Sequence, residues 1–518
     1  MKIFTQKHTV FPFALLLFIS LSIIQFILIQ NPGFEFNYGA EFGRVAESIY
    51  YGKGYGNVWG GNTGPTATVP PVLVFLHLLG LVLFDNLLYS FLFIQVLKFG
   101  SFGLSFYFIY SVLRHHQYWS NIYGLFFLFY LFIFLSFTTN FHFTGDLWIN
   151  TLLFSSHLFV FSNFLKNPST QNLVFLSLIC FLAPLVNSAI ALAIITSIGL
   201  FFIIEIIKIS RSQSSPGLFG FFSGLYKIKK LRPLFLQGII LGLAFSVSVG
   251  VWTARNYLVF QEFIPSKSNM WLEFYLANIV DEDGRLSYSS NLKKHPVNNP
   301  EIRDEISIVG GEIAWFNQFK EKGKRYLKNN KEEYFRKVGN RVINAFLFSK
   351  NDMNIAETSF LRNLDAPTKN LLIESKLVTG DNWINLEMEK EECIRTISAL
   401  SLNSKEEVFN DWYAASQNYF LKQKEPFQIF RGLLLALIPT LILFFLLFIK
   451  RYRENPIYYS IFVMYVIYLV PYILVSHQLR YQRPLMVLQI ILIVMFADFL
   501  ISKLRVSKNI ANLFSKQD

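Results

Sequence analysis

Long apolar runs alternate with shorter polar segments along most of this chain. Ten runs are long enough to cross a membrane as helices, and they begin near residues 10, 87, 121, 148, 173, 188, 235, 430, 457 and 486. An eleventh run, residues 70–84, would reach only about 22 Å as a helix, which is short of a bilayer core of roughly 30 Å. The pattern therefore predicts an all-α polytopic membrane protein.

Composition supports this class. The chain has 518 residues, of which 53% are hydrophobic and 16% are charged, whereas a soluble domain carries roughly 25% charged residues. The net charge of +13 fits the excess of Lys and Arg in cytoplasmic loops of membrane proteins. No nucleic-acid partner is expected, because no basic soluble module with interleaved aromatic residues is present. Cys180 lies in an apolar run and Cys393 in a polar region, so no disulfide is expected.

The first apolar run, residues 10–29, could belong to a signal peptide or to a retained helix. It is too long for the apolar part of a signal peptide, and no small-x-small cleavage site follows it. We therefore expect it to be the first transmembrane helix.

Charge decides how residues 70–84 lie. If the N-terminus is cytoplasmic and this run lies along the membrane surface, every short basic loop becomes cytoplasmic; if the run spans, the basic loop 209–232 falls outside. We therefore predict ten spans, one juxtamembrane helix and cytoplasmic N- and C-termini, in the inner (cytoplasmic) membrane. The basic residues that this topology places in the cytoplasm are Arg114, Lys166, Arg211, Lys227, Lys229, Lys230, Arg232, Lys450, Arg451, Arg453, Lys503, Arg505 and Lys508.

This topology places four regions on the extracytoplasmic face, at residues 31–86, 140–146, 255–427 and 477–484. The third region is too long for an unstructured loop, and residues 332–346 carry apolar side chains at helical spacing. We expect a mostly helical external cap. Three parts are predicted: a transmembrane module (1–253) containing the first external loop (31–86), the cap region (254–427), and C-terminal helices with a cytoplasmic tail (428–518).

The first external loop contains acids, an arginine, many glycines and aromatic residues. If residues 40–50 form a helix, Glu41 and Arg44 are neighbours on one face. They could form an interfacial ion pair, or Glu41 could take a proton from an acceptor or hold a metal ion. Glu35 and Glu47 are rival acids.

The second external loop contains His142 and Asp146. A charge beside apolar helices is costly unless it has a partner or a function. Asp146 could cap the helix that starts near Trp148, or it could be an active-site acid. The sequence leaves both interpretations open, with His142 as a binding candidate beside it.

Arginines in the last external loop oppose the usual distribution of positive charge. Arg480 and Arg483 suit a phosphate or pyrophosphate through bidentate contacts, although they could also reach lipid headgroups. Arg44, Arg255 and Lys267 are further candidates for binding the substrate or its phosphate.

Several chemistries lack their motifs. The sequence has no Cys/His cluster with zinc spacing, no Walker A loop and no dinucleotide-binding glycine motif. An external reaction would therefore need a donor that is activated in the lipid.

Several short motifs of this chain together resemble those of a known family. They are Glu41-Phe-Gly-Arg44-Val-Ala-Glu-Ser-Ile, Gly52-Lys-Gly54-Tyr, Thr63-Gly-Pro-Thr-Ala67, Pro70-Pro71, Trp252-Thr-Ala-Arg255-Asn256-Tyr, His295-Pro296, Gly311-Glu312 and Arg480-Tyr-Gln-Arg483-Pro484. They resemble segments of bacterial GT-C glycosyltransferases of the family 39 type, which are related to protein O-mannosyltransferases and to the aminoarabinose transferase of lipid A. The resemblance covers most of residues 1–345 and 430–500. Many relatives carry an Asp or an Asp-Glu pair early in the first loop, whereas this chain has a single Glu41.

The resemblance implies a GT-C type helical bundle with extracytoplasmic juxtamembrane helices. It also implies a polyprenyl-phosphate sugar donor, inversion at the sugar, and catalysis on the extracytoplasmic face. The acid of the first loop would act as the base or would orient the acceptor, and an acid of the second loop would assist, which points to Glu41 and Asp146. The sugar, the acceptor (lipid, glycan or protein) and a divalent cation are left open. Tyr38, Tyr55 and Trp59 could stack on sugar or serve in packing.

Two other functions compete with this reading. A polysaccharide ligase or polymerase would use lipid-pyrophosphate glycans in a similar external site. A lipid or solute transporter is disfavoured, because the sequence shows neither repeated halves nor charged, interrupted helices in pairs.

Overall fold

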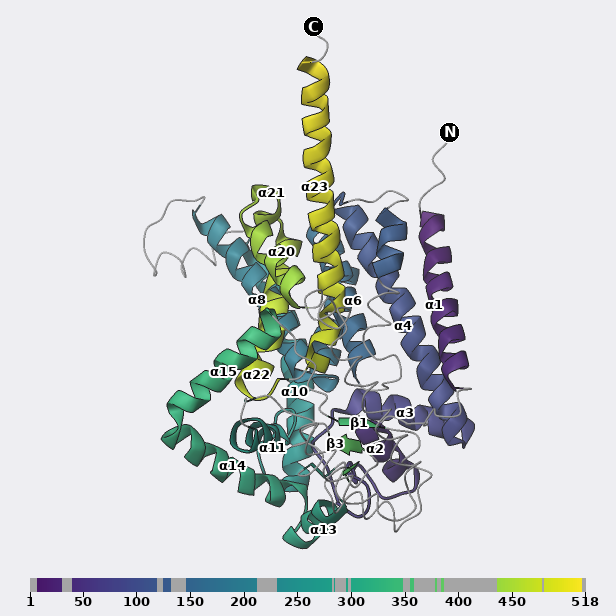
Figure 1. Ribbon diagram of the computed structural model, residues 1–518, viewed down its shortest axis with the longest axis vertical. Coiled ribbons are helices and arrows are strands. Elements are labelled where there is room, and N and C mark those ends of the chain that lie inside the picture. Colours follow the sequence, from purple (N-terminus) through teal and green to yellow (C-terminus); the bar gives the residue numbers. More distant parts are fainter. Residues whose placement is uncertain are drawn as a thin grey trace, which may run out of the picture.

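A helical bundle with a cap at one end makes up this computed structural model. The structure describes residues 7–29, 40–118, 124–131, 146–211, 231–281, 284, 295–296, 300–347, 355–357, 378–379, 383–385, 436–477 and 479–514. Helix α1 (Lys7–Ile29) begins, and α23 (Met486–Phe514) ends, at one end of the bundle. Helices α2 (Ala40–Tyr50), α13 (Pro300–Val309) and α14 (Glu312–Asn329) lie at the opposite end (Figure 1).

Five helices of the described part are long and apolar enough to cross a membrane. The protein is therefore a multi-pass helical membrane protein, as the sequence predicts. The candidate spans are Leu87–His115 in α4, Ser188–Lys208 in α8 (Ser188–Arg211), Arg232–Phe260 in α10 (Leu231–Phe260), Pro456–Leu474, which is α22, and Tyr481–Leu504, most of it in α23.

Other apolar helices begin near four more of the expected starts. They are α1, α6 (Leu147–Lys166), α7 (Thr170–Leu182) and α20 (Ile438–Leu447). The expected span near residue 121 falls partly on residues 124–131, which are helical. The total of ten spans stays a prediction.

Side-chain caps begin several of the membrane helices. Asn86 accepts hydrogen bonds from the backbone N–H groups of Leu88 and Tyr89 at the start of α4. Asn455 does the same for Ile457 at the start of α22, whose first residue is Pro456. The first N–H groups of a helix have no partner within it. The asparagine oxygens accept hydrogen bonds from some of them, and Pro456 has no N–H group.

Basic residues gather at the end of the bundle away from α2. Helix α4 (Leu87–His115) ends with Arg114 and His115, and α6 ends with Lys166. The His116 ring lies 3.0 Å from Ser162 Oγ on α6. Helix α21 (Lys450–Arg453) lies at the same end of the bundle (Figure 1). The first loop and the basic loops therefore lie at opposite ends, as the charge pattern predicts.

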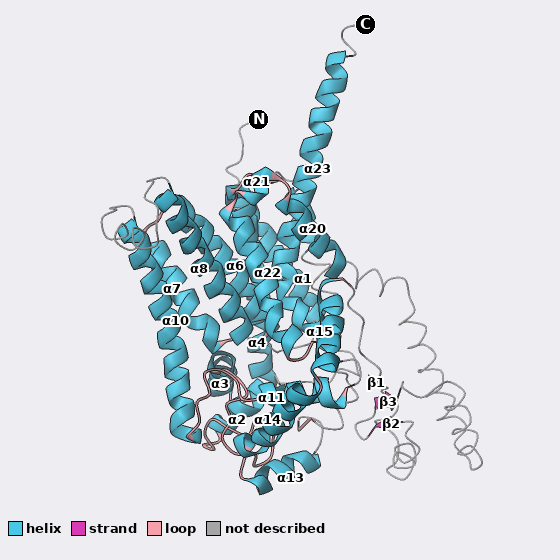
Figure 2. Cartoon of the chain, turned by 90° about the vertical axis from the view of Figure 1, so that its left-hand side faces the viewer, coloured by secondary structure: helices cyan, strands magenta, loops and turns pink. Residues whose placement is uncertain are grey.

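Helix α3 (Pro71–Phe84) runs across the bundle rather than along it. In Figure 1 it lies across the ends of α1 and α4, and in Figure 2 it is seen nearly end-on. Its 14 residues begin with Pro71 and stop at Asp85, whose φ of 47° breaks the helix. A helix that runs across the bundle is therefore present at residues 71–84, and its position along the membrane surface stays a prediction.

The cap is helical where the structure describes residues 270–347. It contains α11 (Met270–Tyr275), a π-helical turn η2 (Leu276–Val280), α13, α14 and α15 (Lys331–Phe346). On α15, Val338 and Phe346 pack against the core, whereas Phe335 and Val342 are exposed. The amphipathic helix that the spacing predicts is therefore present.

A small antiparallel sheet is an element that the sequence reading did not expect. Strands β1 (Ile355–Glu357) and β2 (Val378–Thr379) flank β3 (Trp383–Asn385) in the order β1-β3-β2. Its three short strands lie in the region expected to form the helical cap.

Candidate functional site at the first external loop

Helix α2 carries both candidates of the first loop. Glu41 lies in its first turn, and one turn later Arg44 donates a hydrogen bond from Nη1 to the Trp59 carbonyl over 3.2 Å. Arg44 makes no ion pair within 4.0 Å with any acid that the structure describes. The Glu41 and Glu47 carboxylates act on it at longer range. Arg44 is thus directed at the loop backbone rather than at Glu41.

The segment from Gly56 to Pro65 folds into a tight loop beneath Arg44. Asn57 N–H donates to the Gly64 carbonyl over 2.7 Å, and Gly64 N–H donates to Asn57 Oδ1 over 3.0 Å. A Cβ at Gly56 would lie 2.4 Å from the Gly64 oxygen, so only glycine fits there. The glycines of this motif therefore form a compact frame.

Glu312 links the first external loop to the cap through hydrogen bonds. Its carboxylate accepts hydrogen bonds from Thr66 Oγ1 (2.5 Å), from Ala67 N–H (3.0 Å) and from Ser268 Oγ (2.6 Å). Burial raises the pKa of Glu312, and these donors oppose that rise. Both carboxylate oxygens are occupied, so Glu312 holds three chain segments together.

Arg255 is directed to the same segment of the first loop. Its Nη1 donates to the Thr66 carbonyl over 2.7 Å and its Nη2 to the Tyr55 carbonyl over 3.2 Å. The guanidinium carbon lies 4.7 Å from the Tyr55 ring centre and 5.1 Å from that of Trp252. A phosphate-binding role for Arg255 stays a prediction, and these contacts leave fewer of its N–H groups for a ligand.

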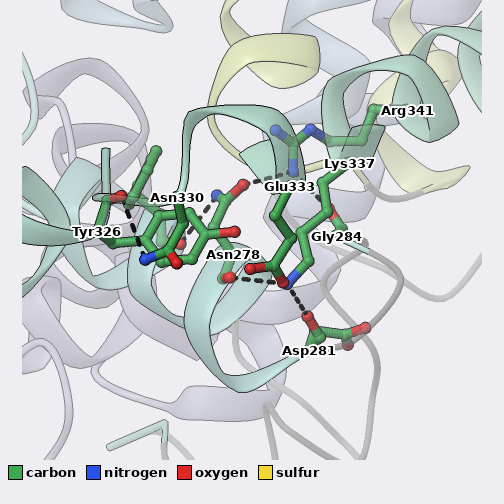
Figure 3. Close-up of polar contacts among 9 residues, drawn as sticks. Asn278, Asp281, Gly284, Tyr326, Asn330, Glu333, Lys337 and Arg341 are labelled. Atoms are coloured by element: carbon green, nitrogen blue, oxygen red, sulfur yellow. Dashed lines mark hydrogen bonds and ion pairs between the residues drawn. The ribbon is translucent and has the colours of Figure 1, made fainter. Parts of the chain in front are cut away.

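In the cap, the side chains of Arg341 and Lys337 also donate hydrogen bonds to backbone carbonyl groups (Figure 3). Arg341 is fully buried and donates to the carbonyls of Ile473 and Gly284, both over 2.6 Å, and to Asn278 Oδ1 over 3.0 Å. Lys337 donates to two carbonyls over 2.8 Å. Arg341 thus joins α15 to the end of α22, whereas Lys337, which also pairs with Glu333 over 2.9 Å, joins α15 to η2 and to Asp281.

Asp146 lies at the start of α6, at the end of the bundle nearer the first loop. Its side chain does not cap α6. Instead, Oδ2 accepts a 2.6 Å hydrogen bond from Asn187 Nδ2, while Asn187 Oδ1 caps α8 by accepting from Ala189 N–H over 2.9 Å. No described residue donates a hydrogen bond to Asp146 Oδ1. One oxygen is held in place, and the other has no hydrogen-bond donor among the described residues.

Aromatic side chains surround Asp146. The carboxylate is within electrostatic range of Tyr468 and Tyr472 on α22. The Tyr472 ring stacks on Tyr481 with 4.2 Å between ring centres. Tyr481 lies in the 3-10 helix η5 (Leu479–Leu485), which packs against α6. An acid and stacked rings therefore share this part of the bundle.

The remaining candidates divide between the described and the undescribed parts of the chain. Arg483 lies in η5, half-buried, and Lys267 lies beside Ser268 of the Glu312 cluster. His142 and the side chain of Arg480 fall outside the described residues.

The two candidate acids lie in different clusters. Glu41 is on α2, which packs on α3, whereas Asp146 lies among α6, α8 and α22. Their joint role in one site stays a prediction. Within the described residues, no group of three His, Cys, Asp or Glu side chains is arranged to hold a metal ion.

The sequence reading did not single out Glu312 or Asn187 as site residues. Glu312 follows Gly310 and Gly311, which both have positive φ. A Gly-Gly pair directly before an acid is the sequence feature that could have pointed to Glu312. Asn187 stands alone between two apolar runs, where a polar residue calls for a partner.

Comparison with models of protein families, with curated proteins and with solved structures gave no match.

Proposed function

We propose that this protein is a membrane glycosyltransferase that moves a sugar from a polyprenyl-phosphate donor to a lipid, glycan or protein acceptor on the extracytoplasmic face. The observation that carries the proposal is the Asp146 carboxylate, held through one oxygen beside the stacked Tyr472 and Tyr481 rings. A few oriented polar groups among aromatic side chains are typical of small-molecule sites. The resemblance in the first loop supplies the donor class.

The reaction is a single displacement. The acceptor oxygen or nitrogen attacks the anomeric carbon, and the bond from that carbon to the phosphate oxygen breaks. Polyprenyl phosphate leaves with the electron pair, and the acceptor's proton passes to a carboxylate. We assign Glu41 or Asp146 as that base, with Asp146 Oδ1 as the acceptor atom in the second case.

The leaving phosphate needs a cation near Asp146. Arg483 lies in η5, which packs against the helix that Asp146 begins, and Arg480 lies in the same turn. Guanidinium groups stabilise developing phosphate charge through paired hydrogen bonds. We assign this role to Arg483, with Arg480 as its partner.

The lipid donor would reach this site from the outer leaflet. Helix α3 buries His77 and exposes Phe75 and Val82, as suits a helix lying in the membrane interface. We propose residence in the inner membrane with cytoplasmic termini, so that the basic end of the bundle faces the cytoplasm.

Transfer in proteoliposomes tests the proposal. The purified protein is incubated with a radiolabelled polyprenyl-phosphate sugar and a membrane extract that supplies acceptors. Asp146→Asn and Glu41→Gln should each lower transfer, by about 10²- to 10⁴-fold for the residue that acts as the base. Glu305→Gln is the matched control, because this acid is exposed on α13. Full turnover by both acid variants, with intact folding, would remove the assignment.

A further inference from the structure

Two arginines converge on Gly60 from different parts of the chain. Arg44 comes from α2 and Arg303 from α13 of the cap. A Cβ built on Gly60 would lie 3.4 Å from Arg303 Nη1 and 4.0 Å from Arg44 Nε. Gly60 has a φ of +88°, a conformation that favours glycine. The first loop therefore places two guanidinium groups beside one small residue.

Within the described part of the chain, no acid lies close enough to neutralise either of these guanidinium groups. Among the described residues, no carboxylate lies within 4.0 Å of Arg44 or Arg303. Arg303 Nε is buried and has no hydrogen-bond partner in this part of the chain. Arg44 donates only to the Trp59 carbonyl there. Two positive charges beside the same residue repel each other, and an anion bound between them would offset this repulsion.

The electrostatics of Arg44 agree with this geometry. Burial lowers the pKa of Arg44, and the charge of Arg303 lowers it further. Glu41 and Glu47 raise it, but each by less than Arg303 lowers it. After burial, the charge of the second arginine is therefore the largest influence on the pKa of Arg44.

The surrounding loop has further unused donors and a firm attachment to α13. Trp59 Nε1 and Thr63 Oγ1 are buried and lack a partner among the described residues. Ser307 Oγ, one turn after Arg303, donates to the Asn62 carbonyl over 3.0 Å. The loop and α13 are thus joined directly beside the arginine pair.

We propose that Arg44 and Arg303 together bind a phosphate group, which bridges the first external loop and the cap. Guanidinium groups donate paired hydrogen bonds to phosphate oxygens, and two of them match the charge of a phosphate. The phosphate belongs either to a lipid headgroup or to a soluble phosphate compound. The site uses residues other than Arg483 and does not depend on the transfer reaction.

Phosphate-dependent stabilisation tests the site without any assay of transfer. The full chain in nanodiscs of neutral lipid is heated at increasing concentrations of inorganic phosphate, and the apparent Kd is read from the shift in Tm. Arg44→Gln and Arg303→Gln should each weaken binding about tenfold or more, since each removes charged hydrogen bonds. Arg325→Gln, on an exposed position of α14, should bind as the wild type does.

A fall in folding stability alone would not produce this pattern. Arg303→Lys keeps the charge and should recover part of the affinity that Arg303→Gln loses. If wild type, Arg44→Gln and Arg303→Gln respond equally to phosphate, or if none responds, the proposal is overturned.

A second arm identifies the source of the phosphate. Polyprenyl phosphate is added to the nanodiscs before the titration. A higher apparent Kd for inorganic phosphate in the wild type, without such a change in Arg303→Gln, assigns the site to a lipid headgroup. An unchanged Kd in the wild type assigns it to a soluble phosphate compound.

Discussion

Glu312 and Asp146 are acids at the same end of the bundle, but their surroundings differ. Glu312 is fully buried, and both its oxygens accept hydrogen bonds from the protein. Asp146 is half-buried, and within the described part of the chain only its Oδ2 accepts a hydrogen bond. A carboxylate with no free oxygen joins chain segments, whereas one with a free oxygen can bind a substrate or accept a proton. The difference separates a structural acid from a candidate catalytic acid.

The arginines divide in the same way. Arg255 and Arg341 donate to backbone carbonyls and to asparagine side chains, so their positive charges are solvated by the protein. Arg44 and Arg303 both lie beside Gly60 and have few acceptors in the described part of the chain. The first pair stabilises the fold, and the second pair is suited to an anion.

Removing Glu312 should have the largest effect on stability. Glu312→Ala leaves the donors of Thr66, Ala67 and Ser268 without their acceptor. Each lost bond costs about 1–3 kcal/mol, so the three together should cost roughly 3–9 kcal/mol in the free energy of unfolding. Denaturant unfolding in detergent measures it. Glu305→Ala, at an exposed position, should change little, and equal stability of the two variants would contradict the role of Glu312.

Removing Arg341 should cost somewhat less. Arg341→Met keeps an apolar stem of similar length but leaves Asn278 Oδ1 and the Ile473 and Gly284 carbonyls without a donor. We expect a loss of about 2–4 kcal/mol. The same unfolding experiment tests it, with Arg325→Met as the exposed control; a difference below about 1 kcal/mol between them would count against the argument.

Asn187 connects stability to activity. Asn187→Ala removes the donor that orients Asp146 and the cap of α8. The lost cap costs about 0.5–2 kcal/mol of stability, and transfer should fall by about 10- to 100-fold through the misplaced carboxylate. Asn187→Ser restores a capping oxygen but not the reach to Asp146. It should recover stability and not activity; parallel recovery of both would refute a positioning role.

The smallest effect is a dependence of stability on pH at Glu312. Its pKa is raised above the ordinary value of 4.5, mainly by burial. Between the unfolded and folded pKa values the folded protein binds more protons than the unfolded chain, so stability falls as pH rises through this interval. Unfolding measured from about pH 4 upward should show a steeper fall in the wild type than in Glu312→Gln. Equal slopes would contradict this account of Glu312.

Much of the helical framework could be predicted from local sequence. The apolar runs gave the spans of α4, α8, α10, α22 and α23, and length with charge placed residues 71–84 as a helix across the bundle. The helix at residues 40–50, on which the placement of Glu41 and Arg44 on one face depends, is present as α2. These features depend on neighbours within a few turns, which a single sequence displays.

The polar clusters could not be predicted in the same way. Glu312 and Thr66 are 246 residues apart, and Asn187 meets Asp146 across 41 residues. Arg303 is one of several charged residues at the start of α13, a pattern typical of a solvent-exposed helix face. Only the fold brings these groups together, so the sequence suggested Asp146 and Arg44 but not their partners.

The choice of donor tests the central claim most directly. The reconstituted protein is given, in parallel, a radiolabelled polyprenyl-monophosphate sugar and a radiolabelled polyprenyl-pyrophosphate oligosaccharide, each with the same membrane extract. We predict transfer of label from the monophosphate alone, and its loss in Asp146→Asn. Transfer from the pyrophosphate donor alone, or transfer that Asp146→Asn leaves unchanged, would contradict the proposed function.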